Sequence, residues 1–357
     1  MKTTPKLRRG KLLLEIIKDP ERKPILRILK ELIILTFIHK EFPGHYFTSY
    51  LFKEGSSNVK DYLPIKLAAR IVPRLNDQRL KEVLDNKLYF DLFYRQFNIE
   101  IPLVVMYNHG KNFCRGSEVF QINSVEEFNQ RLKELFELYS SLTSIIVKKI
   151  YASSKGADIY KIRKEEVLSN HHSIRDIYLK IIQSEFIFQE TIIQHAKLNA
   201  LNPSSVNTFR IDTLLDDEGK VNVLSAYIRM SLRNHFVDNI GSGGCMVGVD
   251  LKTGELQKYA RSDFNYDGAK LFTRHPMTGT VFEGFMLPYI NEIKDLVTRA
   301  ALLVPGLRII GWDVAISEAG PVIIEGNSDY GIRGNDIAYG GYLAHPVLRK
   351  VLEEIHK

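Results

Sequence analysis

Three side chains that carry oxygen ligands, Asp313, Glu325 and Asn327, occur close together near the end of this 357-residue sequence. Residues 309–316 are rich in β-branched and aromatic side chains, and residues 322–324 begin a second apolar run after a Glu-Ala-Gly-Pro break. This pattern predicts two strands joined by a tight turn. Because side chains alternate along a strand, Glu325 and Asn327 project from the same face of the second strand.

The register of this hairpin decides what its acids can do. If the turn is centred on Ala319, Asp313 lies directly across from Glu325, and a bulge would shift the pairing by one residue. Two opposed carboxylates destabilise a sheet, and a divalent cation between them would reverse that effect. Asp, Glu and Asn supply the hard oxygen ligands that Mg²⁺ takes together with waters and phosphate oxygens. The hairpin therefore predicts a metal–phosphate platform, and the alternative is a solvent-facing turn whose acids bind no metal.

Basic residues within strands are the next candidates, because they can contact phosphates. The apolar run of residues 145–147 ends in Lys148 and Lys149, and a Ser-rich turn follows. Such a turn offers backbone N–H groups and hydroxyls, as phosphate-covering loops do, although a lysine at a strand end is usually just an exposed charge. Arg210 and Arg229 lie inside apolar strands, where a guanidinium is costly unless it is paired or binds an anion.

Polar groups also follow two other predicted strands. Residues 185–190 form an apolar strand that ends in a carboxylate, and the backbone after it is suited to hydrogen-bond an adenine edge at a hinge between lobes. An ordinary strand terminus fits the same residues equally well. Arg233, Asp238, Asn239 and the glycines of residues 241–244 form a polar loop that could hold a substrate or a polyphosphate.

Composition narrows the class of protein. The apolar content of 45% and the charged content of 25% are ordinary for a soluble globular chain, and 357 residues suffice for two or three domains. Cys114 and Cys245 form neither a disulfide framework nor a zinc spacing, so we expect both to be buried apolar-type residues in a cytoplasmic protein. No Ser/His/Asp or Cys/His nucleophile pattern and no nucleic-acid recognition motif occurs, which argues against nucleic acid as a partner.

The net charge of +7 is concentrated at the start of the chain. Residues 1–60 contain 13 Lys and Arg against six Asp and Glu, and the rest of the chain is balanced. A basic amphipathic start is typical of contact with an anionic membrane surface or an acidic partner. A solvated basic helix face explains it too, and we favour that explanation. The start lacks the apolar core of a signal peptide, and residues 32–38 are too short to span a bilayer.

The pattern along the chain predicts a basic helical region followed by alternating strands and helices. Asp85-Asn86-Lys87 opens a helix, and Ser124 begins another through a capping box with Glu127. The other predicted strands and helices cover residues 103–105, 206–215, 221–230, 245–250, 288–303 and 346–356.

Several motifs in this order carry a resemblance to a known family. They include IEIPLV, IIVKK, FIFQETI, NTFRI, VDNIGSGG, HPMTG and GWDVAISEAGPVIIEGN. Over roughly residues 80–357 the sequence resembles the ATP-grasp superfamily. Within it, the sequence is most similar to the sugar-transfer-associated ATP-grasp proteins of polysaccharide biosynthesis loci. The resemblance implies an α+β ATP-grasp fold whose two lobes grip ATP. The expected division is a basic helical region over residues 1–82, a small lobe over 83–190 and a large lobe with the Mg²⁺ site over 191–357.

The resemblance also implies roles for individual residues. Asp313, Glu325 and Asn327 would hold two Mg²⁺ ions, and Arg210 and Arg229 would steady the γ-phosphate and an acyl phosphate. The implied ATP contacts are Lys87, Lys148 or Lys149, Ser154, Gln189, Glu190, Thr191, Ile192, His195 and Lys197. The implied acceptor site is bordered by Arg233, Asn239, Gly243 and Gly244. One departure is that the phosphate-covering loop has a single glycine, Gly156, where the superfamily usually has several.

The function implied is an ATP-dependent carboxylate–amine ligase that acts through an acyl phosphate. Its partners would be a small-molecule carboxylate and an amine or sugar acceptor, such as a uronic acid and an amine. Closure of the lobes would exclude water from the acyl phosphate. The alternatives are a kinase of a sugar or small alcohol on the same fold, and an ATP-binding scaffold without turnover, against which the complete set of metal ligands argues.

Overall fold

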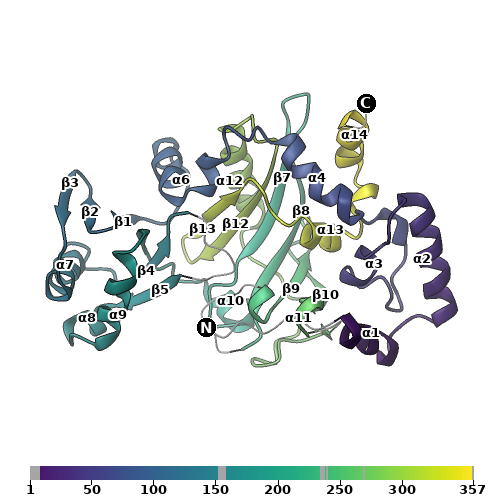
Figure 1. Ribbon diagram of the computed structural model, residues 1–357, viewed down its shortest axis with the longest axis horizontal. Helices are drawn as coiled ribbons and strands as arrows, with labels where there is room; N and C mark the ends of the chain where they lie inside the picture. Colours follow the sequence, from purple (N-terminus) through teal and green to yellow (C-terminus); the bar gives the residue numbers. More distant parts are fainter. Residues whose placement is uncertain (1–8, 152–157, 234–237, 239, 268–269, 356–357) are drawn as a thin grey trace. The chain divides into compact units, whose positions relative to one another are not determined.

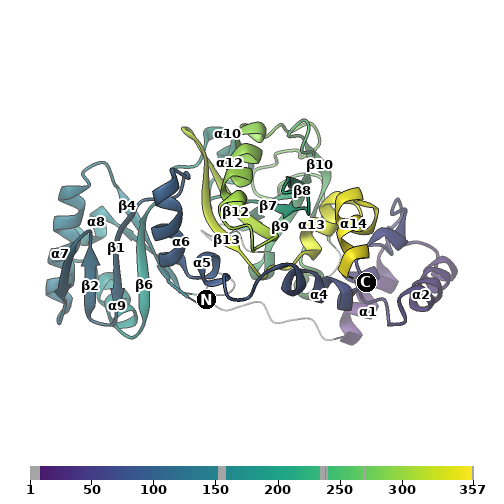
Figure 2. The ribbon, with the colours of Figure 1, turned by 90° about the horizontal axis from the view of Figure 1, so that it is seen from above.

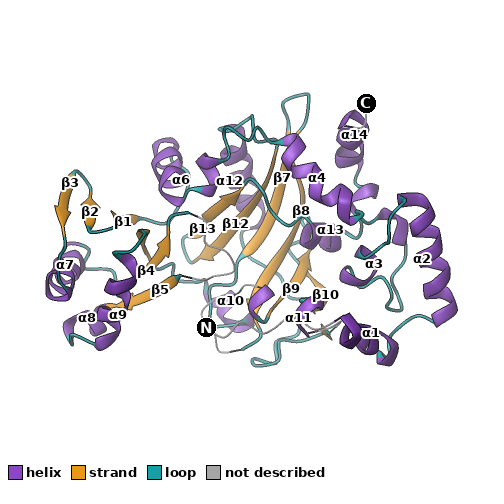
Figure 3. Ribbon diagram, in the orientation of Figure 1, coloured by secondary structure: helices purple, strands orange, loops and turns teal. Residues whose placement is uncertain are grey.

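The computed structural model describes residues 9–151, 158–233, 238, 240–267 and 270–355, and the chain divides into two compact units (Figure 1). Unit 1 comprises residues 1–81, 194–321 and 326–357, and unit 2 comprises residues 82–193 and 322–325. Each unit combines helices with an antiparallel sheet (Figure 3), which confirms the expected α+β class.

Unit 1 contains the N-terminal helices and the longer strands. Its helices and 3₁₀ turns are α1 (Arg9–Lys18), α2 (Ile25–His39), α3 (His45–Thr48), η1 (Val59–Asp61), α4 (Ile65–Leu75), α10 (Ala196–Leu201), η3 (Ile240–Ser242), α11 (Phe264–Asp267), α12 (Ile290–Leu302), α13 (Arg333–Tyr339), η4 (Tyr342–Ala344) and α14 (Pro346–Ile355). Its strands are β7 (Phe209–Leu215), β8 (Val221–Ser231), β9 (Gly244–Val249), β10 (Leu256–Ser262), β11 (Leu271–Phe272), β12 (Ile309–Ser317) and β13 (Gly320–Asn327), of which residues 322–325 belong to unit 2.

The sheet of unit 1 has the order β11-β10-β9-β8-β7-β12-β13. The last two strands form the hairpin predicted from residues 309–327, and β7 and β8 form the second predicted hairpin. The antiparallel register of β12 with β7 pairs Asp313 with Arg210 and Gly311 with Asp212. All four residues therefore lie on one face of the sheet, because their positions along each strand differ by two.

Helices cover this sheet because its strands are buried on both faces. Every residue of β7 except Leu215 is buried, and so is every residue of β12 except Ser317. Helix α12 packs against β7, β8 and β12, and α13 packs against β7, β8 and β9 (Figure 2). Strands buried on both faces read as continuous apolar runs, so the charged residues inside them need specific partners.

Asp212 is one of these charged residues, and a polar network surrounds it. Its carboxylate accepts hydrogen bonds from the hydroxyls of Tyr330 (2.8 Å) and Tyr342 (2.7 Å), from the amide side chain of Asn335 (3.0 Å) and from the backbone N–H of Ser225 (3.1 Å). These donors come from β8 and from the segment around α13. The network therefore fixes the end of the chain onto the central strands.

The N-terminal segment belongs to unit 1 because hydrogen bonds join it to the sheet and to α13. The side chain of Asn76 donates to the carbonyls of Ile309 (2.7 Å) and Ser328 (2.8 Å), and it accepts from the N–H of Ile309 (2.9 Å). Nearer the start, Arg333 of α13 donates to the carbonyl of Leu63 at 2.6 Å. These buried bonds anchor the entry to β12 and the exit from β13.

Unit 2 contains a smaller sheet together with its own helices. Its helices and 3₁₀ turn are α5 (Glu82–Asp85), α6 (Lys87–Tyr94), η2 (Arg95–Phe97), α7 (Val125–Leu138), α8 (Lys164–Leu168) and α9 (His172–Ile181). Its strands are β1 (Val104–His109), β2 (Asn112–Arg115), β3 (Glu118–Gln121), β4 (Ser144–Lys149), β5 (Ile159–Arg163) and β6 (Glu185–Glu190), in the order β3-β2-β1-β6-β4-β5.

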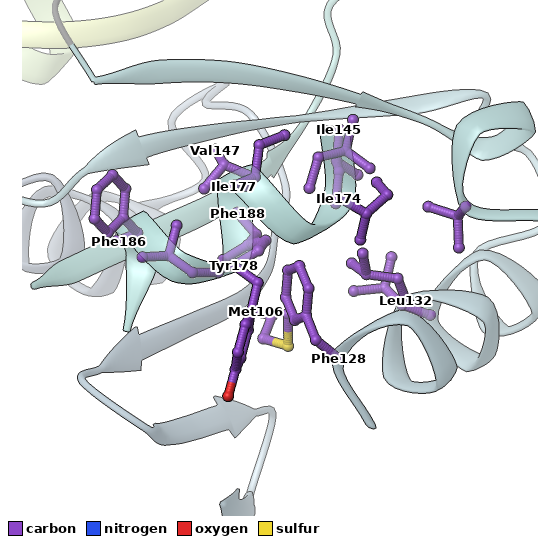
Figure 4. Close-up of a cluster of buried hydrophobic side chains, with 14 of the residues drawn as sticks. Met106, Phe128, Leu132, Ile145, Val147, Ile174, Ile177, Tyr178, Phe186 and Phe188 are labelled. Carbon is purple, nitrogen blue, oxygen red and sulfur yellow. The ribbon is translucent and has the colours of Figure 1, made fainter. Parts of the chain in front are cut away.

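The core of unit 2 lies between this sheet and helices α7 and α9 (Figure 4). Phe128 and Leu132 of α7 and Tyr178 of α9 meet Val147 of β4 and Phe188 of β6 in one buried cluster. The predicted cap of α7 is present, since the Ser124 hydroxyl accepts the N–H of Glu127 at 3.2 Å. The Glu127 carboxylate returns to the N–H of Asn123 rather than to Ser124 itself.

Two sequence expectations need adjustment. Cys245 is fully buried as expected, but Cys114 is only half-buried, because it lies on the short strand β2 near the edge of the sheet. The strand expected from residue 206 begins at Phe209 instead. Before it, the side chain of Asn207 donates to the carbonyls of Leu198 and Asn202, and these bonds hold the backbone outside the ladder.

The Asp212 network predicts a dependence of stability on pH. Burial raises the pKa of Asp212 to about 6, although the hydrogen bonds from Tyr342 and Tyr330 lower it. A carboxyl whose pKa is raised on folding contributes stability that is fully present below its unfolded pKa and is lost as the pH rises through the folded pKa. We therefore expect wild type to gain stability relative to Asp212→Asn as the pH falls from about 7 to about 5.

Denaturant unfolding of both proteins at each pH measures this difference. The raised pKa of Asp336, which is also about 6 and is caused first by burial, is common to both proteins and cancels. A stability difference that does not change with pH would mean that Asp212 does not titrate in this range. As a second variant, Asp212→Ala should cost about 3–5 kcal/mol near pH 7, because it leaves several buried donors without an acceptor. Its cost should rise toward pH 5 as that of Asp212→Asn does, because it removes the same titrating group.

Candidate functional site

The carboxylate of Asp313 on β12 is held by two arginines from β7 and β8, the next two strands on one side of it in the sheet of unit 1. Arg210 of β7 binds it with two nitrogens, through Nε to Oδ1 and through a terminal nitrogen to Oδ2 at 3.0 Å. Arg229 of β8 donates to Oδ2 at 2.9 Å. All three side chains are largely buried. The register explains the contact, because Asp313 lies directly opposite Arg210.

Arg229 joins this pair to a second acid. Its Nε lies 3.6 Å from Oδ2 of Asp238, and its guanidinium donates to the Thr208 hydroxyl at 2.9 and 3.2 Å. Thr208 in turn donates to Asp238 through its hydroxyl and through its N–H, the latter at 2.9 Å. We call Arg210, Arg229, Asp313, Asp238 and Thr208 the arginine–aspartate cluster.

The charges of this cluster balance, with two guanidiniums and two carboxylates. Burial by itself lowers the pKa of Arg229, but the attraction of Asp313 and Asp238 outweighs burial and raises that pKa. Burial raises the pKa of Asp238, and Arg229 opposes the shift. A planar guanidinium with several donors matches phosphate and carboxylate geometry. The cluster therefore offers the guanidinium donors of Arg210 and Arg229 to an anion, and the Asp313 carboxylate holds both guanidiniums in position.

The other two predicted metal ligands lie on β13. Nδ2 of Asn327 donates to the carbonyl of Gly311 at 3.2 Å, so the amide nitrogen is occupied by the neighbouring strand. In unit 2, the Glu325 carboxylate lies 3.9 Å from Nζ of Lys87, the first residue of α6. The side chain of Asn86 caps this helix by accepting the N–H groups of Leu88 (3.0 Å) and Tyr89 (3.1 Å).

The donor chemistry of Asp313, Glu325 and Asn327 fits a hard cation, since all three side chains offer oxygen. Among the described residues, no group of three or more His, Cys, Asp and Glu side chains gathers closely enough to hold a metal by itself. Mg²⁺ commonly takes only one or two carboxylates and completes its shell with water and phosphate oxygens. The set therefore suits Mg²⁺ that arrives with a phosphate better than a metal bound by protein alone.

On β4 of unit 2, the two candidate lysines point to opposite faces. Lys148 lies opposite Ile187, and Lys149 lies opposite Phe186 of the hydrophobic core. Strand alternation puts Lys148 on the face away from α7 and α9, together with Gln189. Both of these side chains are buried, and the Oε1 atom of Gln189 is buried without a hydrogen-bond partner. A buried acceptor in this position is suited to a donor such as the adenine amino group.

The residues after Gln189 are held by the sheet. The N–H of Glu190 donates to the carbonyl of Leu103, and Oε1 of Glu190 accepts the N–H of Leu103 at 2.8 Å. The Ser144 hydroxyl donates to that of Thr191 at 3.0 Å. Ile192, which follows, is half-buried. The side chains of Glu190 and Thr191 are thus used structurally.

His195 and Lys197 lie at the start of α10 in unit 1. Nδ1 of His195 accepts the N–H of Lys197 at 3.0 Å, and Nε2 lies 3.6 Å from the carboxylate of Glu318. The ring of His195 meets Tyr289 edge to face, and the Lys197 ammonium lies over the ring of Phe285. His195 therefore acts as a helix cap, and the exposed Lys197 is the more accessible of the two.

The expected acceptor loop is described in part. Arg233 is exposed, and its carbonyl accepts the hydroxyls of Ser204 (3.2 Å) and Ser231 (2.8 Å). Gly243 has a φ of +96°, a conformation open to glycine, and Gly244 begins β9. Asn239 and, in the phosphate-covering loop, Ser154 lie outside the described residues.

Of the cluster members, Thr208 has no role predicted from the sequence, and Asp238 is predicted only as part of a polar loop that could hold a substrate or a polyphosphate. Thr208 lies two residues before Arg210, and Asp238 lies in the polar loop after β8. Strand alternation places Thr208 on the same side as Arg210, which is the signal that could have identified it. No sequence signal could have identified the contact with Asp238, because it joins residues 30 positions apart.

Comparison with known proteins gives a family match and distant structural likeness. No curated protein matches the chain. Among solved structures, D-alanyl-alanine synthetase A from Vibrio cholerae is 12% identical over 76% of this chain and 65% of its own, with a TM-score of 0.44. D-cycloserine synthetase DcsG is 9% identical over 79% of this chain and 74% of its own, also with a TM-score of 0.44.

N5-carboxyaminoimidazole ribonucleotide synthetase from Thermotoga maritima is 10% identical over 69% of this chain, with a TM-score of 0.35. The chain covers 42% of that protein, so it spans less than half of its length. At these values no activity can be transferred from the structural matches.

The family comparison is more specific, because it extends over most of the sequence. The model of the sugar-transfer associated ATP-grasp family matches residues 66–355, a span that includes nearly all of α4, all of unit 2, every candidate site residue and the whole of α14. The chain belongs to the sugar-transfer associated ATP-grasp family.

Proposed function

We propose that the protein is an ATP-dependent carboxylate–amine ligase that works through an acyl phosphate. The observation that carries the proposal is the arginine–aspartate cluster, found in a chain of an ATP-grasp family. Two buried guanidiniums on one face of a rigid sheet are suited to bind the oxygens of a transferring phosphoryl group. Their position on adjacent strands, rather than on loops, holds them in a defined geometry.

The proposed reaction has two steps. A carboxylate oxygen of the substrate attacks the γ-phosphorus of ATP, and ADP leaves with the electron pair of the broken P–O bond. An amine nitrogen then attacks the acyl carbon, phosphate leaves, and the nitrogen loses a proton. Arg210 and Arg229 would stabilise the negative charge on the γ-phosphate and then on the acyl phosphate, since both are oxyanions in in-line transfer.

In unit 2 we assign the nucleotide contacts to the face of β4 and β6 that carries Lys148. Lys87 and Lys148 would bind phosphates, and the position of Lys148 beside Gln189 favours it over Lys149. The orphan acceptor of Gln189 and the backbone of residues 190–192 would bind adenine. For the ribose we assign His195 or Lys197 of unit 1.

The divalent ion, Mg²⁺, would be held by Asp313, Glu325 and Asn327. When bound, it would neutralise charge on the phosphates and orient the transfer. The two arginines that hold Asp313 would contact the γ-phosphate, and the lysine near Glu325 would contact ATP phosphates. Asp313 and Glu325 would thus have two roles, since each would bind Mg²⁺ and each would position the basic side chains that it pairs with.

The substrate is proposed from the family alone. Membership in a sugar-transfer associated family supports a sugar or uronic acid in surface-polysaccharide biosynthesis, joined to an amino acid or amine. Arg233, Gly243, Gly244 and Asn239 would border this acceptor. An exposed arginine beside a glycine-bordered loop is suited to a carboxylate or a hydroxylated ring.

Replacing Asp313 and Glu325 tests the metal assignment, and the two variants should differ in their unfolding free energy. We expect Asp313→Asn and Glu325→Gln each to lower ATP-dependent turnover at least about 100-fold. Asp313→Asn should also cost about 3–5 kcal/mol of unfolding free energy, because it leaves two buried guanidiniums short of a counter-charge. Glu325→Gln should cost less than about 1 kcal/mol, because its carboxylate is partly exposed and its ion pair is long.

Turnover measured with Mg-ATP and thermal unfolding measured in parallel separate the two effects. Activity retained in both variants would make the metal assignment wrong. If only Asp313→Asn lost activity, and Glu325→Gln were both stable and active, Glu325 would have no role in binding the metal. The functional role would then belong to the arginine–aspartate cluster alone.

The opposite faces of β4 provide a matched pair for the nucleotide assignment. We expect Lys148→Met to raise the KM for ATP about tenfold to 100-fold, since it removes a charged hydrogen bond to a phosphate. Lys149→Met, which makes the same change on the core face, should leave KM within about twofold. Steady-state kinetics at saturating acceptor measures both values, and the reverse pattern would exchange the two lysines.

The competing kinase is distinguished by its products. With a carboxylate and an amine supplied, a ligase releases free phosphate and forms an amide in equal amounts, whereas a kinase forms a phosphorylated acceptor and releases no phosphate. Mass spectrometry with a phosphate-release assay on a panel of uronic acids, amino acids and amino sugars measures both. A phosphorylated sugar without phosphate release would replace the ligase by the kinase.

A further inference from the structure

Helix α2 has two apolar faces, and among the described residues only one of them packs against the rest of unit 1. Ile28 and Leu35 are buried against Tyr46, Leu51 and Phe52 in the cluster of N-terminal side chains. In a helix with 3.6 residues per turn, these two positions lie about 20° apart and define the inner face. The whole sequence of α2, ILRILKELIILTFIH, is strongly apolar, so apolar side chains occur outside the inner face as well.

The outer face of α2 consists of Leu26, Leu29, Ile33 and Phe37, and it is exposed. The four residues are accessible to 82%, 50%, 68% and 87%. They lie within about 40° of Ile33 around the helix, and about 120° or more from Leu35. Single exposed apolar residues are ordinary, but a continuous stripe of large ones on one helix marks an interaction surface.

This surface extends beyond the stripe. A groove of about 510 Å³ follows it, lined by Leu29, Leu32, Ile33, Thr36, Phe37 and Lys40. Phe42, just after the helix, is 70% exposed. Figures 1 and 2 both place α2 at the outer edge of unit 1, where a flat partner can approach it.

Positive charge flanks the apolar stripe. By the same helical geometry, Lys30 lies about 60° from Ile33. Lys40, the residue that caps the end of the helix, lines the groove together with Phe37. The acids nearby are engaged with other cations, because Glu31 binds Lys23 and Arg27. Glu41 likewise pairs with a lysine outside the helix, Lys66. The surface is therefore apolar with a net positive border, within a segment that holds the whole charge excess of the chain.

This combination favours a lipid surface over a second copy of the chain. A symmetric pair of α2 helices would place Lys30 and Lys40 of both copies in one interface, where Glu31, the acid of the helix, is already bound. Anionic headgroups would instead supply the missing counter-charge, while the lysine stems extend along the apolar surface. A helix of 15 residues is about 22 Å long, which suits a position in the plane of a bilayer.

We propose that α2 docks unit 1 onto a bilayer that contains anionic lipids, with Leu26, Leu29, Ile33 and Phe37 inserted below the headgroups and Lys30 and Lys40 among them. Among the described residues no helix is long and apolar enough to cross a membrane. The docking is independent of the ligase activity proposed above.

Vesicle sedimentation of the full chain tests the docking. The wild type should bind vesicles of equal parts phosphatidylcholine and phosphatidylglycerol, with weaker binding as salt is added. Ile33→Ser with Phe37→Ser should weaken binding at least about tenfold, since it removes two of the most exposed apolar groups. Lys30→Gln with Lys40→Gln should also weaken binding to these vesicles, and adding salt should have less effect on this variant.

Matched controls use comparably exposed residues away from α2. Leu138→Ser with Leu168→Ser removes two apolar groups that are 64% and 60% exposed, and Lys111→Gln with Lys252→Gln removes two exposed lysines. Both control pairs should bind as the wild type does. Equal loss in the controls would mean nonspecific adsorption and would overturn the proposal.

Fluorescence gives a second readout that does not depend on affinity. The chain has one tryptophan, Trp312, which is fully buried and donates to Thr213, so it should not respond to lipid. The Phe37→Trp variant should show a blue shift with the anionic vesicles and quenching by brominated lipid. An unchanged emission spectrum of this variant in the presence of these vesicles would overturn the proposal. So would a wild-type dimer that Ile33→Ser with Phe37→Ser converts to a monomer, since the surface would then be an interface between copies.

Discussion

The Asp313 carboxylate, buried between two guanidiniums, is the interaction on which the functional face of unit 1 depends. A charge in the interior of a sheet is tolerated only with counter-charges in good hydrogen-bond geometry, and here Arg210 and Arg229 provide them from the two nearest strands on that side. This requirement fixes the relative register of β7, β8 and β12. A one-residue slip of any strand would separate the charges and move each to the opposite face.

The surroundings of this cluster make its geometry rigid. Asp212 lies on the same face and is saturated by hydrogen bonds from Tyr330, Tyr342 and Asn335. At Gly311, a Cβ would lie 2.7 Å from the Tyr330 ring, so the ring packs directly on the strand backbone. The face is thus covered by polar and aromatic groups with defined partners, which is how a site on strands keeps its donors in place.

The N-terminal region shows a different balance. The segment around α4 is tied to the sheet through Asn76 and to α13 through Arg333. Among the described residues, α2 buries only one of its two apolar faces. An exposed apolar stripe contributes nothing to folding and promotes aggregation, so its persistence in a chain is best explained by a partner. The sequence around α4 is therefore explained by its contacts inside unit 1, whereas the outer face of α2 is explained by a partner outside it.

The sequence by itself determined the hairpins of β7–β8 and β12–β13, the helix start at Asp85-Asn86-Lys87, the cap at Ser124 and the ATP-grasp family, because these depend on local spacing and on ordered motifs. It could not identify α13, whose sequence RGNDIAY has little apolar periodicity and is buried by contacts from distant strands. It left Lys148 and Lys149 as alternatives, and only the pairing with β6 showed which one shares a face with Gln189. The acids of the last hairpin were predicted as a platform facing a metal. The tertiary structure decided that Asp313 first meets Arg210 and Arg229, because partners 84 and 103 residues away are brought together by strand register, which no local pattern specifies.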